Sequence, residues 1–172
     1  MTDARRRLRR AADLLNAAIE YCAAGVLVFT VVVNFTQIVL RYGFNSGLPW
    51  SEEAMRYAMI WMAMLAGAAV VYRQEHVVSS LVPASAPEGV QLVSRFVAVA
   101  TTAAFATLLV VHGTKAALAN TVQFSPAMRM PLALAYAAMP IGGLVMLVNV
   151  VALLGLGLPR PEHDELAAGE TA

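Results

Sequence analysis

Four long apolar runs, separated by short polar segments, set the pattern of this chain. The runs cover approximately residues 17–40, 54–72, 90–111 and 132–154. Each is close to the ~20 residues that a helix needs to cross the hydrocarbon core of a bilayer. The segments between them are too short for a soluble domain and hold the helix breakers Gly43, Gly47, Pro49, Pro83, Pro87, Pro126 and Pro131. The pattern therefore predicts an all-α integral membrane protein with four transmembrane helices, built as a single domain over residues 1–172.

The segment before the first run, Asp3 to Ile19, has an amphipathic pattern of its own. Apolar residues recur there at helical spacing and arginines occupy the other side: Leu8, Ala11, Ala12, Leu15 and Ile19 against Arg5, Arg6, Arg7, Arg9 and Arg10. This layout is typical of a helix that lies in the membrane interface and attracts anionic headgroups. The same arginines are equally well explained as a topology signal. We expect an N-terminal interfacial amphipathic helix with membrane lipids as partners, and both explanations of its arginines stay open.

The placement of basic residues predicts the orientation of the four helices. The arginine cluster precedes the first helix, while Arg73 and Arg95 flank the loop between the second and the third. Basic residues collect on the cytoplasmic side of membrane proteins, so both termini are expected in the cytoplasm. The first run is longer than the apolar core of a secretory signal, and no A-x-A-like cleavage site follows it. We therefore interpret it as a retained helix.

Composition agrees with a membrane protein and removes several classes of function. Hydrophobic residues make up 59% of the chain and charged residues 13%, with a mean hydropathy of +0.66. Soluble domains are about half apolar and about a quarter charged. The single cysteine, Cys22, excludes an internal disulfide and is expected to be a small core residue. The sequence has no nucleotide-binding loop, nucleophile elbow or zinc-ligand spacing. We expect no enzyme activity, cofactor, metal site or nucleic-acid partner.

A charged cluster at the start of the second run is the strongest candidate for function. Ser51 follows Pro49 and is expected to cap the helix, with Glu52 and Glu53 in the first turn, where carboxylates suit the positive end of the helix dipole. Arg56 lies four residues after Glu52 and can pair with it. A proton or cation site is the alternative. Because the acids stand at the helix start and not in mid-membrane, capping or a subunit contact is favoured.

Histidines on neighbouring helices can ligate haem in respiratory membrane anchors, but the spacing here argues against such a site. His76 is expected just past the end of the second helix, and His112 just past the end of the third. In antiparallel neighbours those two ends lie about 30 Å apart. One iron cannot join them, and His163 lies in the polar tail.

Polar and small residues inside the apolar runs predict helix packing. Asn34, Thr36 and Gln37 are expected in the outer half of the first helix, where polar side chains usually bond to a neighbouring helix. A substrate path through this helix is the alternative. The small residues between Ala63 and Ala69 favour close approach of a second helix.

Two sequence blocks carry the most distinctive residues of the chain. The first is R-Y-x-F-N at 41–45 and L-P-W-S-E-E-x-x-R at 48–56, and it continues through Trp61, Gly67, Ala68, Ala69, Arg73 and His76. The second is S-P-A-M-R-M-P at 125–131 and Y-x-x-x-P-x-G at 136–142. Together the two blocks resemble the small permease subunit (DctQ-like) of TRAP, or tripartite ATP-independent periplasmic, transporters. They stand in the expected order and reach over nearly the whole chain. Glu75, where glycine is more usual, and Arg129 depart from the family pattern.

This resemblance implies a static scaffold subunit of the bacterial inner membrane that pairs with a large permease subunit. The pair would take up an organic acid with sodium, after a periplasmic substrate-binding protein delivers it. We expect the partner contact at Trp50, Glu52, Glu53, Arg56, Trp61, Arg73, His76, Ser125, Pro131 and Tyr136. Two alternatives remain. One is a self-sufficient homodimeric exporter, which needs a mid-membrane acid that only Glu20 approaches, and the other is the membrane anchor of a redox enzyme.

Overall fold

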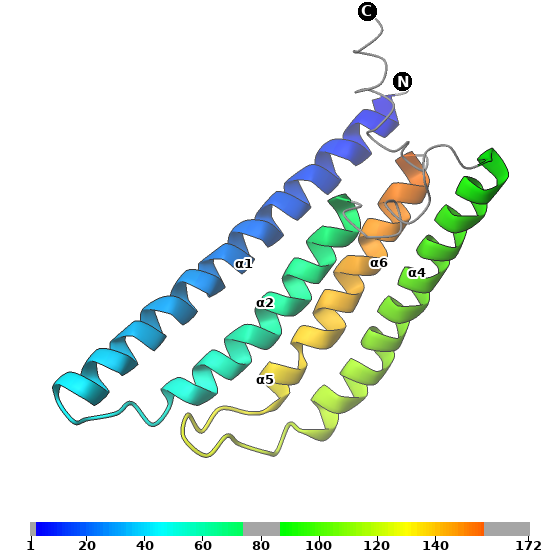
Figure 1. The fold of residues 1–172 in the computed structure, drawn as a ribbon. Helices are drawn as coiled ribbons and strands as arrows, with labels where there is room; N and C mark the ends of the chain where they lie inside the picture. The colour runs from blue at the N-terminus through cyan, green and yellow to red at the C-terminus, as the bar shows by residue number, and fades with distance from the viewer. Residues whose placement is uncertain (1–2, 74–86, 157–172) are drawn as a thin grey trace, which may run out of the picture.

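The computed structural model describes residues 3–73 and 87–156, and these residues are largely helical (Figure 1). The helices are α1 (Asp3–Gly43), α2 (Ser51–Arg73), α4 (Glu88–Ala119), α5 (Ala133–Tyr136) and α6 (Ala138–Leu156). Four stretches are long and apolar enough to cross a membrane, the last of them formed by α5 and α6 together. Within the described ranges the only β-type pairing is an isolated bridge between Phe124 and Pro131. The predicted all-α class with four spanning helices is confirmed.

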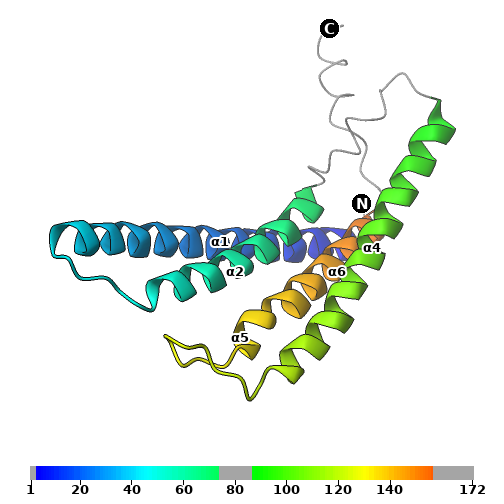
Figure 2. The same cartoon turned by 60° about the horizontal axis from the view of Figure 1, so that its bottom comes forward.

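The long helices lie side by side in the order α1, α2, α6, α4 (Figure 1). α2 packs between α1 and α6, and α6 packs between α2 and α4. Figure 2 shows that this layer is curved, with α1 and α4 at its two edges. Successive long helices run in opposite directions, so α1 begins at the end of the bundle where α2 and α6 end (Figure 1). The cytoplasmic location of that end stays a prediction.

α1 is one continuous helix of 41 residues. The predicted amphipathic segment is therefore its N-terminal part and not a separate helix in the plane of the interface. The reason is visible in the sequence, because no proline and no glycine other than Gly25 interrupts residues 3–42. At 1.5 Å per residue α1 is roughly 60 Å long, about twice the thickness of the hydrocarbon core.

The core lies where α2, α4 and α6 meet. It consists of Ala68 and Val71 from α2, Ala106 from α4, and Met146 and Val150 from α6. Two glycines of α6 let its neighbours approach closely. A Cβ on Gly142 would lie 2.8 Å from Met64 Cβ, and a Cβ on Gly143 would lie 2.8 Å from the carbonyl oxygen of Ala106. Atoms do not pack at such distances, so both contacts require glycine.

The small residues of α2 contribute to this packing only in part. Ala68 and Ala69 are buried, whereas Ala63 and Ala66 are exposed. The prediction of close helix approach therefore holds for the second half of that stretch, which faces the core.

α4 continues to Ala119, beyond the predicted end at residue 111. His112 therefore lies inside α4, and its expected position past the helix end was wrong. The extension contains good helix formers in Lys115 and Leu118. Gly113 is accommodated because it lies against Pro140, with only 2.7 Å between a Cβ placed there and Pro140 Cδ. His76 and His163 lie outside the described residues.

Candidate functional site

Glu53 joins the start of α2 to the loop between α4 and α5. Its carboxylate accepts the backbone N–H groups of Ala127, at 3.2 Å, and of Met128, at 3.0 Å. A carboxylate that accepts two backbone donors satisfies loop groups that no secondary structure pairs. Ser125 is buried beside this carboxylate. The Oγ of Ser125 is close to the carboxylate, but its orientation is not that of a hydrogen bond with any described residue. Glu53 thus holds the loop onto α2.

The α4–α5 loop is itself folded around Ser125. The Ser125 N–H donates to the Met130 carbonyl at 2.9 Å, and the Arg129 N–H donates to the Ser125 carbonyl at 3.0 Å. Arg129 has φ 52°, in the left-handed region that few non-glycine residues adopt. Its side chain is exposed. The departure of Arg129 from the family pattern therefore falls at the turn of a well-bonded loop.

Glu52 and Arg56 are exposed beside this loop and make no hydrogen bond or ion pair with any described residue. The predicted pair between them was wrong, since an exposed pair gains too little to fix two flexible side chains. The predicted cap was also wrong. Ser51 Oγ donates to the Leu48 carbonyl at 2.8 Å, because Ser51 is itself the first helical residue and is buried. Arg56 acts on the neighbouring Glu53 carboxylate through its charge, without forming an ion pair. Both exposed side chains can therefore still bond to a partner.

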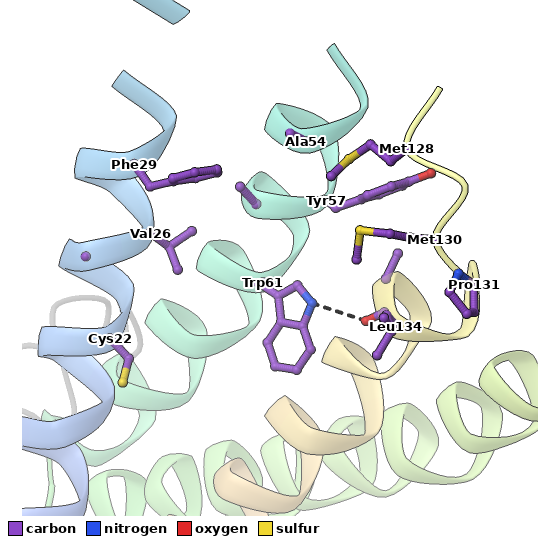
Figure 3. Close-up of a pocket in the computed structure, with 13 residues that line it drawn as sticks. Cys22, Val26, Phe29, Ala54, Tyr57, Trp61, Met128, Met130, Pro131 and Leu134 are labelled. Carbon is purple, nitrogen blue, oxygen red and sulfur yellow. Dashed lines mark hydrogen bonds between the residues drawn. The ribbon is translucent and has the colours of Figure 1, made fainter. Parts of the chain in front are cut away.

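An apolar groove of about 510 Å³ lies between α1, α2 and the α4–α5 loop (Figure 3). Its walls are Cys22, Gly25, Val26 and Phe29 of α1, Ala54, Tyr57, Ala58 and Trp61 of α2, and Met128, Met130, Pro131, Leu134 and Ala135. Figure 3 shows Trp61 reaching across the groove, where its Nε1 donates to the Leu134 carbonyl at 3.2 Å. Cys22 is exposed to this groove, so its expected place in the core was wrong.

The predicted interface residues within the described ranges fall into two groups. Most lie around the groove, on the first half of α2, the α4–α5 loop and α5, whereas Arg73 lies at the far end of α2. Trp50 and Tyr136 belong to the end that carries the groove, and both are at least partly exposed. Arg73 stands at the opposite end and forms a two-bond ion pair with Glu20 of α1. Arg73 therefore helps to hold α2 against α1, while His76 lies outside the described residues.

A second bond joins α1 and α2 at the same end as the Arg73–Glu20 pair. The hydroxyl of Tyr72 donates to Asp13 Oδ1 at 2.6 Å. Asp13 and Glu20, two acidic residues in the N-terminal half of α1, therefore both bind α2. Glu20, the acid that a self-sufficient exporter would need, is thus already paired.

Among the described residues, the most deeply buried contact between polar side chains joins two asparagines that were not among the predicted site residues. Asn16 and Asn149 exchange two amide hydrogen bonds of 2.9 Å. Asn149 Nδ2 also donates to the Ala68 carbonyl at 2.8 Å. The contact therefore ties α1, α6 and α2 together. A usable signal existed, because Asn149 is a lone polar residue inside the fourth apolar run.

The polar residues that were singled out in the first helix do not bond to a neighbouring helix. Thr36 donates to the Val32 carbonyl of its own helix, and Gln37 accepts the N–H of Leu48 at 2.7 Å. Asn34 is exposed and has no hydrogen-bond partner among the described residues. Gln37 therefore fixes the loop after α1, and the expected interhelical bonds were wrong.

The family profile described as "Tripartite ATP-independent periplasmic transporters, DctQ component" matches residues 30–159. The chain belongs to this family. It is a TRAP transporter small permease subunit and a multi-pass membrane protein, and its family is a transporter component and not a class of enzymes. The matched range includes Glu53, the α4–α5 loop and Asn149.

Two proteins of Haemophilus influenzae, both assigned as TRAP transporter small permease proteins, are similar to this chain. The first is 28% identical over 138 residues, which are 80% of this chain and 86% of that protein. The second is 31% identical over 77 residues, which are 45% of this chain and 47% of that protein. The first similarity covers most of both chains and agrees with the family match.

Proposed function

We propose that this small permease subunit serves in the bacterial inner membrane as the static scaffold partner of a large permease subunit. The pair takes up an organic acid together with sodium, and a periplasmic binding protein delivers that acid. Membership of the DctQ family supports the proposal, because the family is one component of a three-part transporter.

The buried polar side chains support a scaffold role. Among the described residues they are Asn16, Ser51, Ser125 and Asn149, none of which ionises near neutral pH. Carriers that couple transport to ions place ionisable groups inside the membrane part of the protein. Here Glu20 is paired with Arg73 and holds two helices together. The substrate and sodium sites are therefore assigned to the large subunit.

The proposed contact with the large subunit is the outer edge, which we define as Glu52, Arg56 and the adjoining groove. The groove offers an apolar surface against which a helix of the partner can pack. Such packing supplies most of the association energy of helices within a membrane. Glu52 and Arg56 carry opposite charges and make no hydrogen bond or ion pair with any described residue, so they are suited to fix the position of that helix. Trp61 and Pro131 line the groove, and Glu53 holds the loop that forms one of its sides.

Charge reversal tests this assignment. The tagged chain is co-expressed with the large permease subunit of its own genome, and the amount of large subunit that purifies with it is measured. Glu52→Arg and Arg56→Glu should each reduce that amount several-fold. Lys115→Glu is the matched control, because Lys115 is exposed and should tolerate reversal. It lies near the C-terminal end of α4, which is at the same end of the bundle as the start of α2 (Figure 1).

The melting temperature of the purified chain separates binding from folding. Glu52 makes no hydrogen bond or ion pair with any described residue, so Glu52→Arg should melt like the wild type. Arg56 acts on the Glu53 carboxylate through its charge, so Arg56→Glu should lower the melting temperature slightly, and Glu52→Arg is the variant that separates binding from folding. Recovery of the large subunit at wild-type levels with both variants would rule out the outer edge as the contact.

A further inference from the structure

The N-terminal turns of α1 carry arginines on the side that faces away from the bundle. Ala12 is buried. Leu8 lies against α6, where a Cβ placed on Gly155 would be 3.1 Å from Leu8 Cδ2. Since each residue of a helix turns about 100°, Arg6, Arg7 and Arg10 point away from the side of Leu8 and Ala12. All three are exposed.

The end of α6 shows the depth at which these arginines lie. α6 is apolar up to its last residue, Leu156, and Leu154 on its exposed side is 52% exposed. An exposed apolar helix end of this kind belongs at the edge of the hydrocarbon core. The contact between Leu8 and Gly155 places the arginine turns beside that edge. Arg6, Arg7 and Arg10 therefore lie at the level of the lipid headgroups.

These three guanidinium groups make no hydrogen bond or ion pair with any residue in 3–73 or 87–156. A guanidinium group binds a phosphate through two parallel N–H bonds, and it stays charged at every physiological pH. We propose that Arg6, Arg7 and Arg10 form a binding face for the phosphate groups of anionic phospholipids, with phosphatidylglycerol as the probe. This face attaches the N-terminal turns of α1 to the membrane surface.

The acidic C-terminal segment is the rival occupant. It follows Leu156 and contains Glu162, Asp164, Glu165 and Glu170. α6, which precedes this segment in the chain, ends at Leu156 beside the surface of α1 that Leu8 and Ala12 occupy. The arginine face is turned the other way, toward the surrounding lipid, and this orientation is the reason to propose phospholipid as the occupant. Binding of the acidic segment is an outcome that the test distinguishes.

Lipid-dependent thermal stability tests the proposal on the purified full chain in neutral detergent. Phosphatidylglycerol should raise the melting temperature by several degrees more than phosphatidylcholine, and added salt should reduce that difference. The variant with Arg6, Arg7 and Arg10 all changed to Gln should respond equally to both lipids. The control with Arg41, Lys115 and Arg129 changed to Gln loses the same charge at the other end of the bundle and should keep the wild-type preference.

Two results would overturn the proposal. One is an equal response of the wild-type chain to the two lipids, and the other is an unchanged preference in the triple arginine variant. A chain that ends at Leu156 should keep the preference, whereas a preference that appears only after this truncation would assign the face to the acidic segment. If the triple variant unfolds, native mass spectrometry should show fewer bound phosphatidylglycerol molecules on Arg10→Gln than on Arg41→Gln, and equal numbers would contradict the proposal.

Discussion

Asn16 and Asn149 face each other between α1 and α6 and satisfy each other's side-chain amides across 133 residues of chain. Asn149 extends the contact to the Ala68 carbonyl of α2. Both side chains are buried in the bundle, where an unpaired amide is costly. This contact matters because α1 stands at the edge of the helix layer and packs mainly on α2.

Asn149→Ala should destabilise the bundle by about 1–2 kcal/mol, because it leaves the Oδ1 and one N–H of the buried Asn16 amide unpaired and removes the second hydrogen bond that the Ala68 carbonyl accepts. The measurement is the thermal midpoint of the purified chain in detergent. Asn34→Ala is the matched control and should change it little, since Asn34 is exposed and unbonded among the described residues. The double variant Asn16→Ala/Asn149→Ala should cost less than the sum of the single changes, and strict additivity would argue against the contact.

Gly142→Ala should destabilise the chain by about 1–3 kcal/mol through overpacking. The added methyl would lie 2.8 Å from Met64 Cβ and 3.2 Å from its backbone oxygen, so α2 and α6 must move apart. Gly25→Ala is the control, because nothing lies within 4 Å of a Cβ at that position. Thermal unfolding compares the two variants, and an equal effect of both would show that α2 and α6 do not approach closely at Gly142.

Glu53→Ala should loosen the α4–α5 loop without unfolding the helices. The change removes the acceptor of the Ala127 and Met128 N–H groups, so these amides should exchange with deuterium several-fold faster. Hydrogen-exchange mass spectrometry of the peptide that covers residues 125–131 measures this effect. Glu52→Ala, one residue away and unbonded, should leave the exchange unchanged; similar protection in both variants would mean that Glu53 does not hold the loop.

Much of the fold could be predicted because apolar run length and helix breakers act locally. α2 and α4 begin within a few residues of the expected positions, directly after the segments that contain Pro49 and Pro87. The residues of α1 were predicted to form two helices, because the change from an arginine-rich to an apolar pattern was interpreted as a helix boundary. A change of composition does not interrupt backbone hydrogen bonding, and only a residue such as proline does so.

The contacts of the candidate site could not be predicted from the sequence, and its role as a subunit interface stays a prediction. Of residues 51–56, Ala54 lines the groove, and the bonding of the cluster depends on which carboxylate reaches a loop 74 residues away. Adjacent helix residues point about 100° apart, so Glu53 meets the loop and Glu52 does not. No local pattern shows where that loop passes. Asn149 could have been singled out as a lone polar residue in its apolar run, but no local pattern identifies Asn16, 133 residues away, as its partner.

Affinity purification of the tagged chain from the membranes of its own host tests the central claim most directly. The account predicts that a large multi-pass permease subunit is recovered with it in equal amount and that Arg56→Glu weakens this association. A chain recovered only as a homodimer, or together with a redox enzyme, would contradict the account.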